Sequence, residues 1–128
     1  MTLNTNLNSP LSIISWNANG LSKHKYEFQL FLEAKNIDIA LISETHFTPT
    51  SHSKIFGYQV YYTCHPDGTA HAGTAIYIKN NLSHHQLAPH SEPYLQTTTI
   101  QVNIVNSTPI AVSAIYCPPG PKILPVEF

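Results

Sequence analysis

Two polar side chains each follow a short apolar run of the sequence. Asn17 comes directly after residues 11–16 (LSIISW), and Glu44 comes directly after residues 37–43 (IDIALIS). A carboxylate can bind a hard cation such as Mg²⁺, and an amide can donate to a phosphate oxygen without adding charge. Together these groups suit metal-assisted phosphodiester chemistry. Ordinary structural roles also explain them, with Glu44 as a solvated strand end and Asn17 as a turn former.

The elements around these two residues must bring them together. Both apolar runs are too short for separate helices and predict buried strands. Between them, Ser22 is the predicted N-cap of an amphipathic helix, and Phe28, Phe31 and Leu32 share one face of it. Asn36 suits the left-handed position after a helix. The two strand ends reach the same sheet edge if the strands are neighbours, which the sequence leaves open.

The rest of the sequence predicts mostly antiparallel strands. Residues 56–63 and 74–79 form a predicted hairpin around a long, turn-rich loop. Residues 80–94 have little periodicity and are predicted to be loop. Apolar and polar residues alternate along 97–105, which indicates a half-buried strand, and residues 110–116 return beside it after a turn.

Length and composition favour a single folded domain. The chain has 128 residues, enough for one core but not for two, and residues 1–10 are expected to form a disordered leader. Hydrophobic residues make up 42%, which excludes a disordered chain, but charged residues make up only 10%. A soluble domain usually carries about 25% charged residues. Either other polar residues build the surface, or more protein normally covers part of it.

Several functional classes lose support from the sequence. A formal net charge of −1 leaves no basic footprint for nucleic acid, and the absence of both Gly-rich phosphate-loop motifs argues against a nucleotide cofactor. No signal peptide or run of about 20 apolar residues is present, so an intracellular protein that does not enter membranes is expected. Cys64 and Cys117 are expected to be buried free thiols, and His84, His85 and His90 to form a solvated surface.

Four segments, in order, resemble the endonuclease/exonuclease/phosphatase family. They are ISWNANGL (14–21), DIALISETHF (38–47), GTAIYIKNNL (73–82) and AIYCPPG (114–120). The resemblance is greatest to the apurinic-type endonuclease domain of jockey-like non-LTR retrotransposons. It implies a partial four-layer α/β sandwich of the DNase I-like kind, truncated before much of the second sheet. Residues 11–128 would then be the N-terminal part of such a domain.

The resemblance implies roles for individual residues. Glu44 would be a metal ligand, and Asn17 would arrange both the metal and the phosphate, with Mg²⁺ as the cofactor and Mn²⁺ as an alternative. Tyr116 would lie near the phosphate and act in catalysis, although an aromatic residue closing a sheet edge is the competing interpretation. Thr45 and His46 would line the cleft and bind substrate, with structural support as the alternative for His46.

One segment departs from the family pattern. Jockey-like sequences often have Arg-Gly-Gly before the third strand, and this chain has His71-Ala72-Gly73 there. His71 is therefore the predicted substrate-facing residue. Because histidine is usually neutral at cellular pH, its affinity for a phosphate is in doubt.

The resemblance also implies a biological role. The parent protein would nick DNA, and the resulting 3′-hydroxyl would prime a reverse transcriptase domain in the same chain, in the nucleus. The family's later Asp–Asn and Asp–His pairs have no counterpart after Gly120, where Glu127 is the only acid. We therefore expect negligible nuclease activity from this chain alone. The alternatives are a non-catalytic remnant, a fragment that needs a partner, or a family member acting on another phosphodiester.

Overall fold

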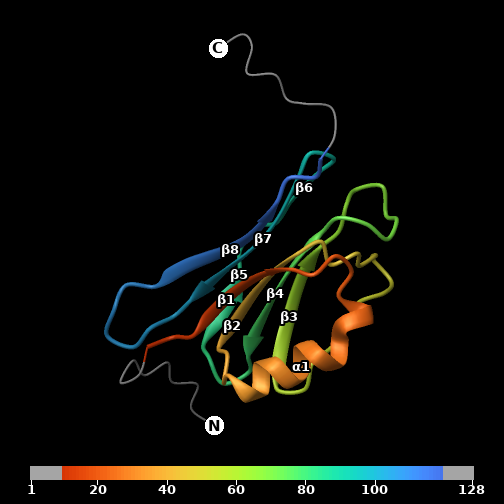
Figure 1. The fold of residues 1–128 in the computed structure, drawn as a ribbon. Helices are drawn as coiled ribbons and strands as arrows, with labels where there is room; N and C mark the ends of the chain where they lie inside the picture. Colours follow the sequence, from red (N-terminus) through yellow and green to blue (C-terminus); the bar gives the residue numbers. More distant parts are fainter. Residues whose placement is uncertain (1–9, 120–128) are drawn as a thin grey trace.

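The computed structural model describes residues 10–119. In it the chain folds into two packed β-sheets and one α-helix (Figure 1). The predicted leader up to residue 9, Gly120 and Glu127 lie outside the described residues. The first sheet has the strand order β1 (Ile13–Asn17), β2 (Ile39–Ser43), β4 (Thr74–Lys79) and β3 (Tyr58–Thr63). The second sheet is built on β7 (Leu95–Val102), with β8 (Ile110–Tyr116) along one side and the short β5 (His84–Gln86) and β6 (His90–Glu92) along the other.

The predicted strand–helix–strand unit is confirmed. β1 and β2 are parallel neighbours, in a register that pairs Ile13 with Ile39 and Asn17 with Ser43. A parallel pair needs a crossover connection, and the chain supplies it with a 3-10 turn, η1 (Ser22–His24), and the helix α1 (Lys25–Ala34). The other strand pairs are antiparallel, as expected, including the β3–β4 hairpin.

The helix differs from its prediction at its start. Ser22 makes no capping hydrogen bond, and its Oγ instead lies 3.1 Å from Ser53 Oγ. The preceding Leu21 is buried, and its N–H donates to Thr45 O at 3.0 Å, so this segment is held against the sheet and α1 begins only at Lys25. Asn36 follows the helix with φ of +51°, which confirms the left-handed position.

Two hydrophobic cores lie on opposite faces of the first sheet. α1 covers one face, where Phe28 and Leu32 pack against β2 and β4, while Phe31 remains 42% exposed. The second sheet covers the other face, where Ile39, Ile76, Ile78, Ile100 and Val102 pack together. β4 is covered on both faces, and this explains why five of its six residues are buried instead of every second one.

Two predictions for the second half of the chain are wrong. Residues 80–94, predicted as loop, contain β5 and β6, whose mostly exposed side chains leave no apolar periodicity to detect. These strands exist because their backbones pair with β7. Both cysteines are free, as expected, but Cys64 is only half-buried and Cys117 is exposed.

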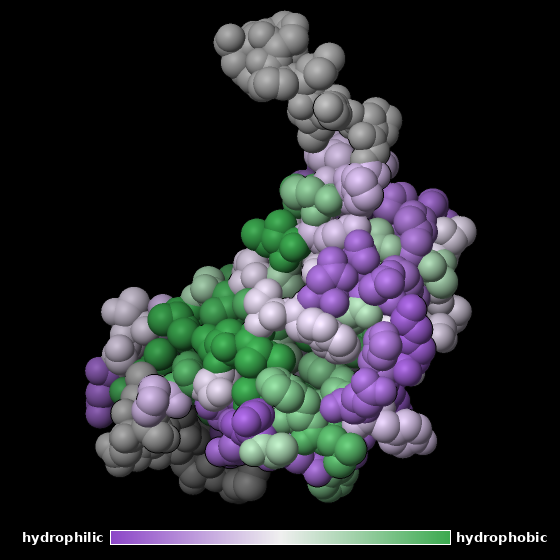
Figure 2. Space-filling model, in the orientation of Figure 1, coloured by the Kyte–Doolittle hydropathy of each residue, from purple (hydrophilic) through white to green (hydrophobic). Residues whose placement is uncertain are grey.

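The outer strands β1 and β8 leave apolar surface uncovered. Within residues 10–119, β1 pairs only with β2 and β8 pairs only with β7. Ile13 on β1 is 41% exposed and Ile115 on β8 is 60% exposed. Figure 2 shows hydrophobic side chains gathered on the face where these two strands lie. Apolar side chains are therefore exposed on both of these edge strands. No helix in this part of the chain is long and apolar enough to cross a membrane.

Two leucines of α1 provide a matched test of the packing. Leu32 is fully buried, whereas Leu30 is 65% exposed. Leu32→Ala should lower the free energy of unfolding by about 2–5 kcal/mol, because it removes buried methyl groups and leaves a cavity. Leu30→Ala should change it by less than about 0.5 kcal/mol. Urea unfolding followed by circular dichroism measures both, and equal losses would contradict the described face of the helix.

Candidate functional site

Asn17 and Glu44 meet at one edge of the first sheet. Asn17 ends β1 and pairs with Ser43, the last residue of β2, and Glu44 follows directly. The loop after β1 is held to the segment after β2, because Ala18 N–H donates to Ser43 O at 2.9 Å and Gly20 N–H donates to Glu44 O at 2.8 Å. The parallel pairing therefore places both side chains at the same end of the sheet.

Asn17 takes the turn-forming role that its sequence position allows. Its Oδ1 accepts the N–H of Asn19 at 3.1 Å, a local bond that shapes the loop after β1. This bond uses the carbonyl end of the amide, and the exposed side chain keeps its NH₂ group as a donor. Forming the turn and donating to an anion are thus compatible roles for one amide.

Tyr116 reaches the same site from the second sheet. It is the last residue of β8, and its hydroxyl donates a hydrogen bond to Glu44 Oε1. Burial, this hydrogen bond and the negative charge of Glu44 raise the pKa of Tyr116 to about 12. The phenol is therefore protonated at neutral pH and acts as a donor that orients the carboxylate. Glu44 keeps its second oxygen for another partner.

The backbone around Glu44 is held in an unusual conformation. Glu44 and His46 have φ of +53° and +61°, a region that costs a non-glycine residue on the order of 1–3 kcal/mol. Three hydrogen bonds hold the segment: Thr45 N–H to Gly73 O at 3.4 Å, His46 N–H to Ala72 O at 3.0 Å, and Phe47 N–H to Thr45 Oγ1 at 3.2 Å. The start of β4 therefore fixes the direction in which Glu44 leaves β2.

Gly73 is required where these segments meet. It has φ of +84°, and a Cβ built there would lie 2.9 Å from Thr45 Oγ1 and 3.0 Å from Thr63 O. The first distance is shorter than real Cβ contacts allow, and the second is tighter than most of them. The close approach lets the Gly73 carbonyl reach the backbone of Thr45, so this glycine positions the Glu44 segment.

The predicted substrate-binding residues occupy three different environments. Thr45 is 1% exposed, so its side chain lies behind the surface and supports the segment. His46 is half-buried, with its Nδ1 close to Gly20. The His71 side chain is 45% exposed and contacts Asp67 and Thr69 of its own loop. The structure thus brings Asn17, Glu44 and Tyr116 together but gives His71 separate partners, and the three substrate-binding roles stay predictions.

A buried polar network beside the site was missed by sequence reasoning. Gln96 is fully buried between the sheets, where it accepts the N–H of Gly73 at 3.1 Å and donates to Glu92 O at 2.7 Å. Gln96 also pairs with Tyr116 across β7 and β8, so it connects the two sheets at the site. Its place two residues before Thr98 on the buried face of β7 is the signal that could have revealed it.

Buried hydroxyls extend this network through the core between the sheets. Thr98 Oγ1 lies 2.9 Å from both Thr74 Oγ1 and Thr63 Oγ1, and Thr63 Oγ1 donates to Thr97 O at 2.9 Å. Because each hydroxyl has a partner, no desolvated polar group opposes folding here. The network fixes the spacing of β4 and β7 near the site end of the sheets.

The donor set at Glu44 suits a hydrated Mg²⁺ ion held largely by water and substrate. Mg²⁺ is usually bound through one or two carboxylates, with waters and phosphate oxygens completing its shell. Within residues 10–119, Glu44 belongs to no group of three metal-ligating side chains. The one carboxylate, oriented by Tyr116, fits such a loosely held cation.

A separate apolar groove of about 430 Å³, lined by Trp16 and Phe28 among others, includes neither Asn17 nor Glu44.

The sequence matches a family model and named relatives. Residues 14–125 match the model of the Endonuclease/Exonuclease/phosphatase family. The chain is 38% identical to the probable RNA-directed DNA polymerase from transposon X-element of Drosophila melanogaster, over 86% of this chain and 12% of the relative. It is 33% identical to the RNA-directed DNA polymerase from mobile element jockey of the same species, over 92% of this chain and 13% of the relative.

Solved structures share the fold. The endonuclease domain of TRAS1, a telomere-specific non-LTR retrotransposon, has a TM-score of 0.68 at 18% identity, covering 90% of this chain and 49% of that one. AP endonuclease LMAP from Leishmania major has a TM-score of 0.66 at 21% identity, covering 83% of this chain and 40% of that one. These likenesses confirm the predicted DNase I-like α/β fold, of which this chain spans less than half.

Two glycines test the contact that positions Glu44. Gly68 and Gly73 both have positive φ, +77° and +84°, but a Cβ at Gly68 would meet nothing within 4 Å. Gly73→Ala should therefore lower the free energy of unfolding by at least about 1–2 kcal/mol more than Gly68→Ala, because it adds a clash to the shared backbone strain. Chemical denaturation of the two variants measures the difference. Equal losses would mean that Thr45 and Gly73 are not in close contact.

A double-mutant cycle tests the contact between the sheets. Glu44→Gln and Tyr116→Phe should together cost less than the sum of the two single changes, with a coupling energy of about 1 kcal/mol, because Tyr116→Phe removes the shared hydrogen bond and Glu44→Gln removes the charge that strengthens it. The control pair is Glu33→Gln, an exposed carboxylate on α1, with Tyr116→Phe, which should be additive. Additivity in both cycles would contradict the Tyr116–Glu44 bond.

Proposed function

The chain belongs to the endonuclease/exonuclease/phosphatase family, and on this premise we propose that it is the N-terminal part of a metal-dependent DNA endonuclease domain. The observation that carries the proposal is the meeting of Asn17, Glu44 and Tyr116 at one end of the two sheets. An amide donor, a carboxylate and a protonated phenol lie there, at the end of β1, directly after β2 and at the end of β8. This combination suits an anionic phosphodiester substrate.

Each residue has a distinct part in the proposed reaction. Glu44 is the metal ligand, and its orientation is set by the hydrogen bond from Tyr116. Mg²⁺ or Mn²⁺ bound there would neutralise charge on the phosphoryl oxygens. Asn17 donates from its amide to a phosphate oxygen, and Tyr116 can give its single hydroxyl proton either to Glu44 or to a substrate oxygen. A protonated phenol suits this donor role, since its pKa lies well above neutral pH.

The relatives suggest the setting in which this domain works. Those named above are RNA-directed DNA polymerases from mobile elements, and this chain spans 12–13% of their length. We infer that the parent protein also carries a reverse transcriptase domain and that the nick in DNA supplies the 3′-hydroxyl from which it copies. Nicking and copying of DNA would take place in the nucleus. With a net charge of −1, this segment contributes little to general attraction of DNA, so other parts of the parent protein make most of the phosphate contacts.

Plasmid nicking by the intact parent protein tests the proposal. Glu44→Gln should lower the nicking rate by at least about 100-fold, because a neutral amide is a poor ligand for Mg²⁺. Glu33→Gln on the exposed face of α1 is the matched control and should leave the rate unchanged. EDTA should abolish nicking, and added Mg²⁺ or Mn²⁺ should restore it. Metal-dependent nicking that survives Glu44→Gln would refute the role of Glu44.

A second assay tests what these residues can do by themselves. The 128-residue chain should leave supercoiled plasmid intact in the presence of Mg²⁺. Within residues 10–119, the polar side-chain partner of Glu44 is Tyr116, whose phenol cannot act as a base at neutral pH. The side chain that contacts Glu44 in the described residues therefore offers no general base for an attacking water. Clear nicking that disappears in Glu44→Ala would show that this expectation is wrong.

A further inference from the structure

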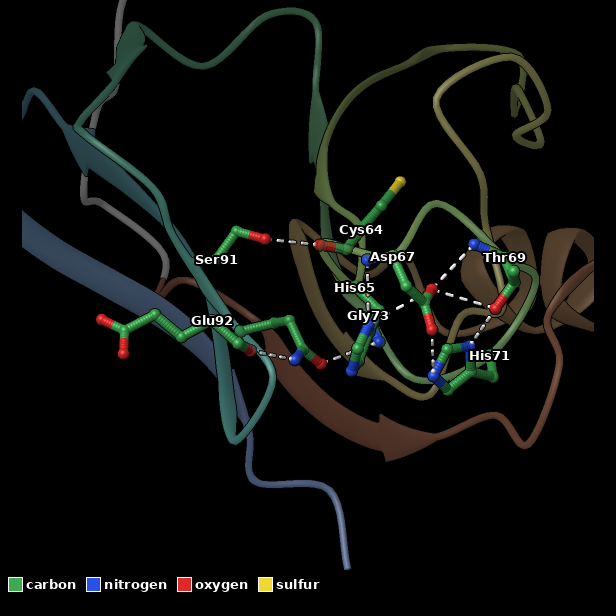
Figure 3. A network of polar contacts seen from close by, with 9 residues as sticks. Cys64, His65, Asp67, Thr69, His71, Gly73, Ser91 and Glu92 are labelled. Atoms are coloured by element: carbon green, nitrogen blue, oxygen red, sulfur yellow. Dashed lines mark hydrogen bonds and ion pairs between the residues drawn. The ribbon is translucent and has the colours of Figure 1, made fainter. Parts of the chain in front are cut away.

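Three metal-ligating side chains gather in the loop between β3 and β4, outside the site at Glu44. His65, Asp67 and His71 each offer one ligand atom, and these atoms lie within 4.8 Å of one another. Figure 3 shows the two imidazoles and the carboxylate turned toward each other. His65 is the most protected of the three, with 13% of its side chain exposed, and the other two are about half exposed. The cluster is thus half-sheltered and open to solvent on one side.

Hydrogen bonds fix the protonation of His71. The Thr69 hydroxyl donates its one hydrogen to Asp67 Oδ1 at 2.9 Å, so its oxygen must accept at its 2.8 Å contact with His71 Nδ1. The neutral ring therefore carries its proton on Nδ1 and its lone pair on Nε2. That lone pair faces Asp67 Oδ2 at 3.5 Å. Two acceptors facing each other repel unless a cation lies between them.

His65 also directs an unprotonated ring nitrogen toward the Asp67 carboxylate. Its Nδ1 accepts the N–H of Asp67 at 3.2 Å, which places a second unprotonated nitrogen 3.2 Å from Asp67 Oδ1. Asp67 Oδ1 accepts both the N–H and the hydroxyl of Thr69, each at 2.9 Å, and these hydrogen bonds favour the ionised carboxylate. Two lone pairs and a negative charge thus converge on one small volume.

The spacing fits a tetrahedral ion. Two ligand atoms each about 2.1 Å from such an ion lie about 3.4 Å apart. The observed separations are 3.5 Å from His71 Nε2 to Asp67 Oδ2 and 3.2 Å from His65 Nδ1 to Asp67 Oδ1, and one ligand atom of each residue lies within 4.8 Å of the other two. A proton on His71 Nε2 is the other way in which the carboxylate could be satisfied. Metal binding at His65 Nδ1 would replace its weak hydrogen bond from Asp67.

We propose that His65, Asp67 and His71 bind a borderline transition-metal ion, with Zn²⁺ as the representative, and that water completes the coordination. Imidazole nitrogens favour such ions over Mg²⁺, which prefers oxygen ligands. The hydrogen bond from His71 Nδ1–H to Thr69 is the kind of contact that orients metal-binding histidines. Cys64 does not join the site, since Figure 3 shows its sulfur pointing away from the three side chains.

The bound ion would stiffen the connection that positions Glu44. The loop returns to β4 through Ala72 and Gly73, whose carbonyls accept the N–H groups of His46 and Thr45. At its other end, the carbonyl of Cys64 accepts the Ser91 hydroxyl at 2.8 Å. A metal that bridges His65 and His71 would close the loop between these two anchors. Its role is structural, and it is independent of the nuclease proposal.

Calorimetric titration with ZnCl₂ tests this site. The 128-residue chain, stripped with EDTA and dialysed at pH 7.5, should bind one Zn²⁺ per chain. His71→Ala and Asp67→Asn should each weaken binding at least about 10-fold, because each removes one of three ligands. His85→Ala, an exposed histidine on β5, and Cys117→Ser, an exposed thiol, are the controls and should bind Zn²⁺ like the parent chain.

Further measurements separate this site from the one at Glu44. Glu44→Gln should leave Zn²⁺ affinity unchanged, and millimolar MgCl₂ should not displace Zn²⁺. Zn²⁺ should raise the thermal midpoint of the parent chain but not of His71→Gln, and matching far-ultraviolet circular dichroism would establish that the variant is folded. The proposal is overturned if the parent chain shows no saturable Zn²⁺ binding, or if binding survives both His71→Ala and Asp67→Asn.

Discussion

The parallel pairing of β1 with β2 is the constraint on which the other features depend. An antiparallel pair would put Asn17 and Glu44 at opposite ends of the sheet. A parallel pair requires a crossover, and α1 supplies it by covering one face of the sheet. The other face is then free for the second sheet, whose β8 carries Tyr116 to the same end. One choice of strand direction thus assembles the candidate site and divides the core in two.

Hydrogen bonds from neighbouring segments hold the strained backbone and the buried polar groups of the site. Glu44 and His46 adopt backbone conformations that non-glycine residues avoid. They hold them because Gly73 lets the segment before β4 approach closely enough to accept the N–H groups of Thr45 and His46. Gln96 joins Gly73 to the second sheet. Such contacts fix the direction of the Glu44 carboxylate before any ligand arrives, which is the preorganisation that electrostatic catalysis needs.

Local patterns in the sequence predicted much of this fold but could not predict contacts between distant residues. Apolar runs identified β1, β2 and β4, and Asn36 marked the end of the helix, because burial and left-handed backbone leave a local signature. β5 and β6 left none, since only backbone pairing with β7 creates them.

Some features of the candidate site could likewise be predicted from local sequence patterns, and others could not. The positions of Asn17 and Glu44 at strand ends could be predicted from the runs before them. The bond between Glu44 and Tyr116 spans 72 residues, so no local pattern encodes it. The motif order, through the family resemblance, selected Tyr116, whereas the burial of Gln96 and the gathering of His65, Asp67 and His71 became visible only in three dimensions.

In the proposed function, Glu44 holds the cation that acts on the phosphodiester. Anomalous diffraction from crystals of the parent protein grown with Mn²⁺ tests it most directly, because Mn²⁺ replaces Mg²⁺ at oxygen sites and its position can be located unambiguously. We expect a peak bonded to a carboxylate oxygen of Glu44, beside the Tyr116 hydroxyl. An ordered Mn²⁺ in the cleft with no bond to Glu44 would contradict the role assigned to this residue.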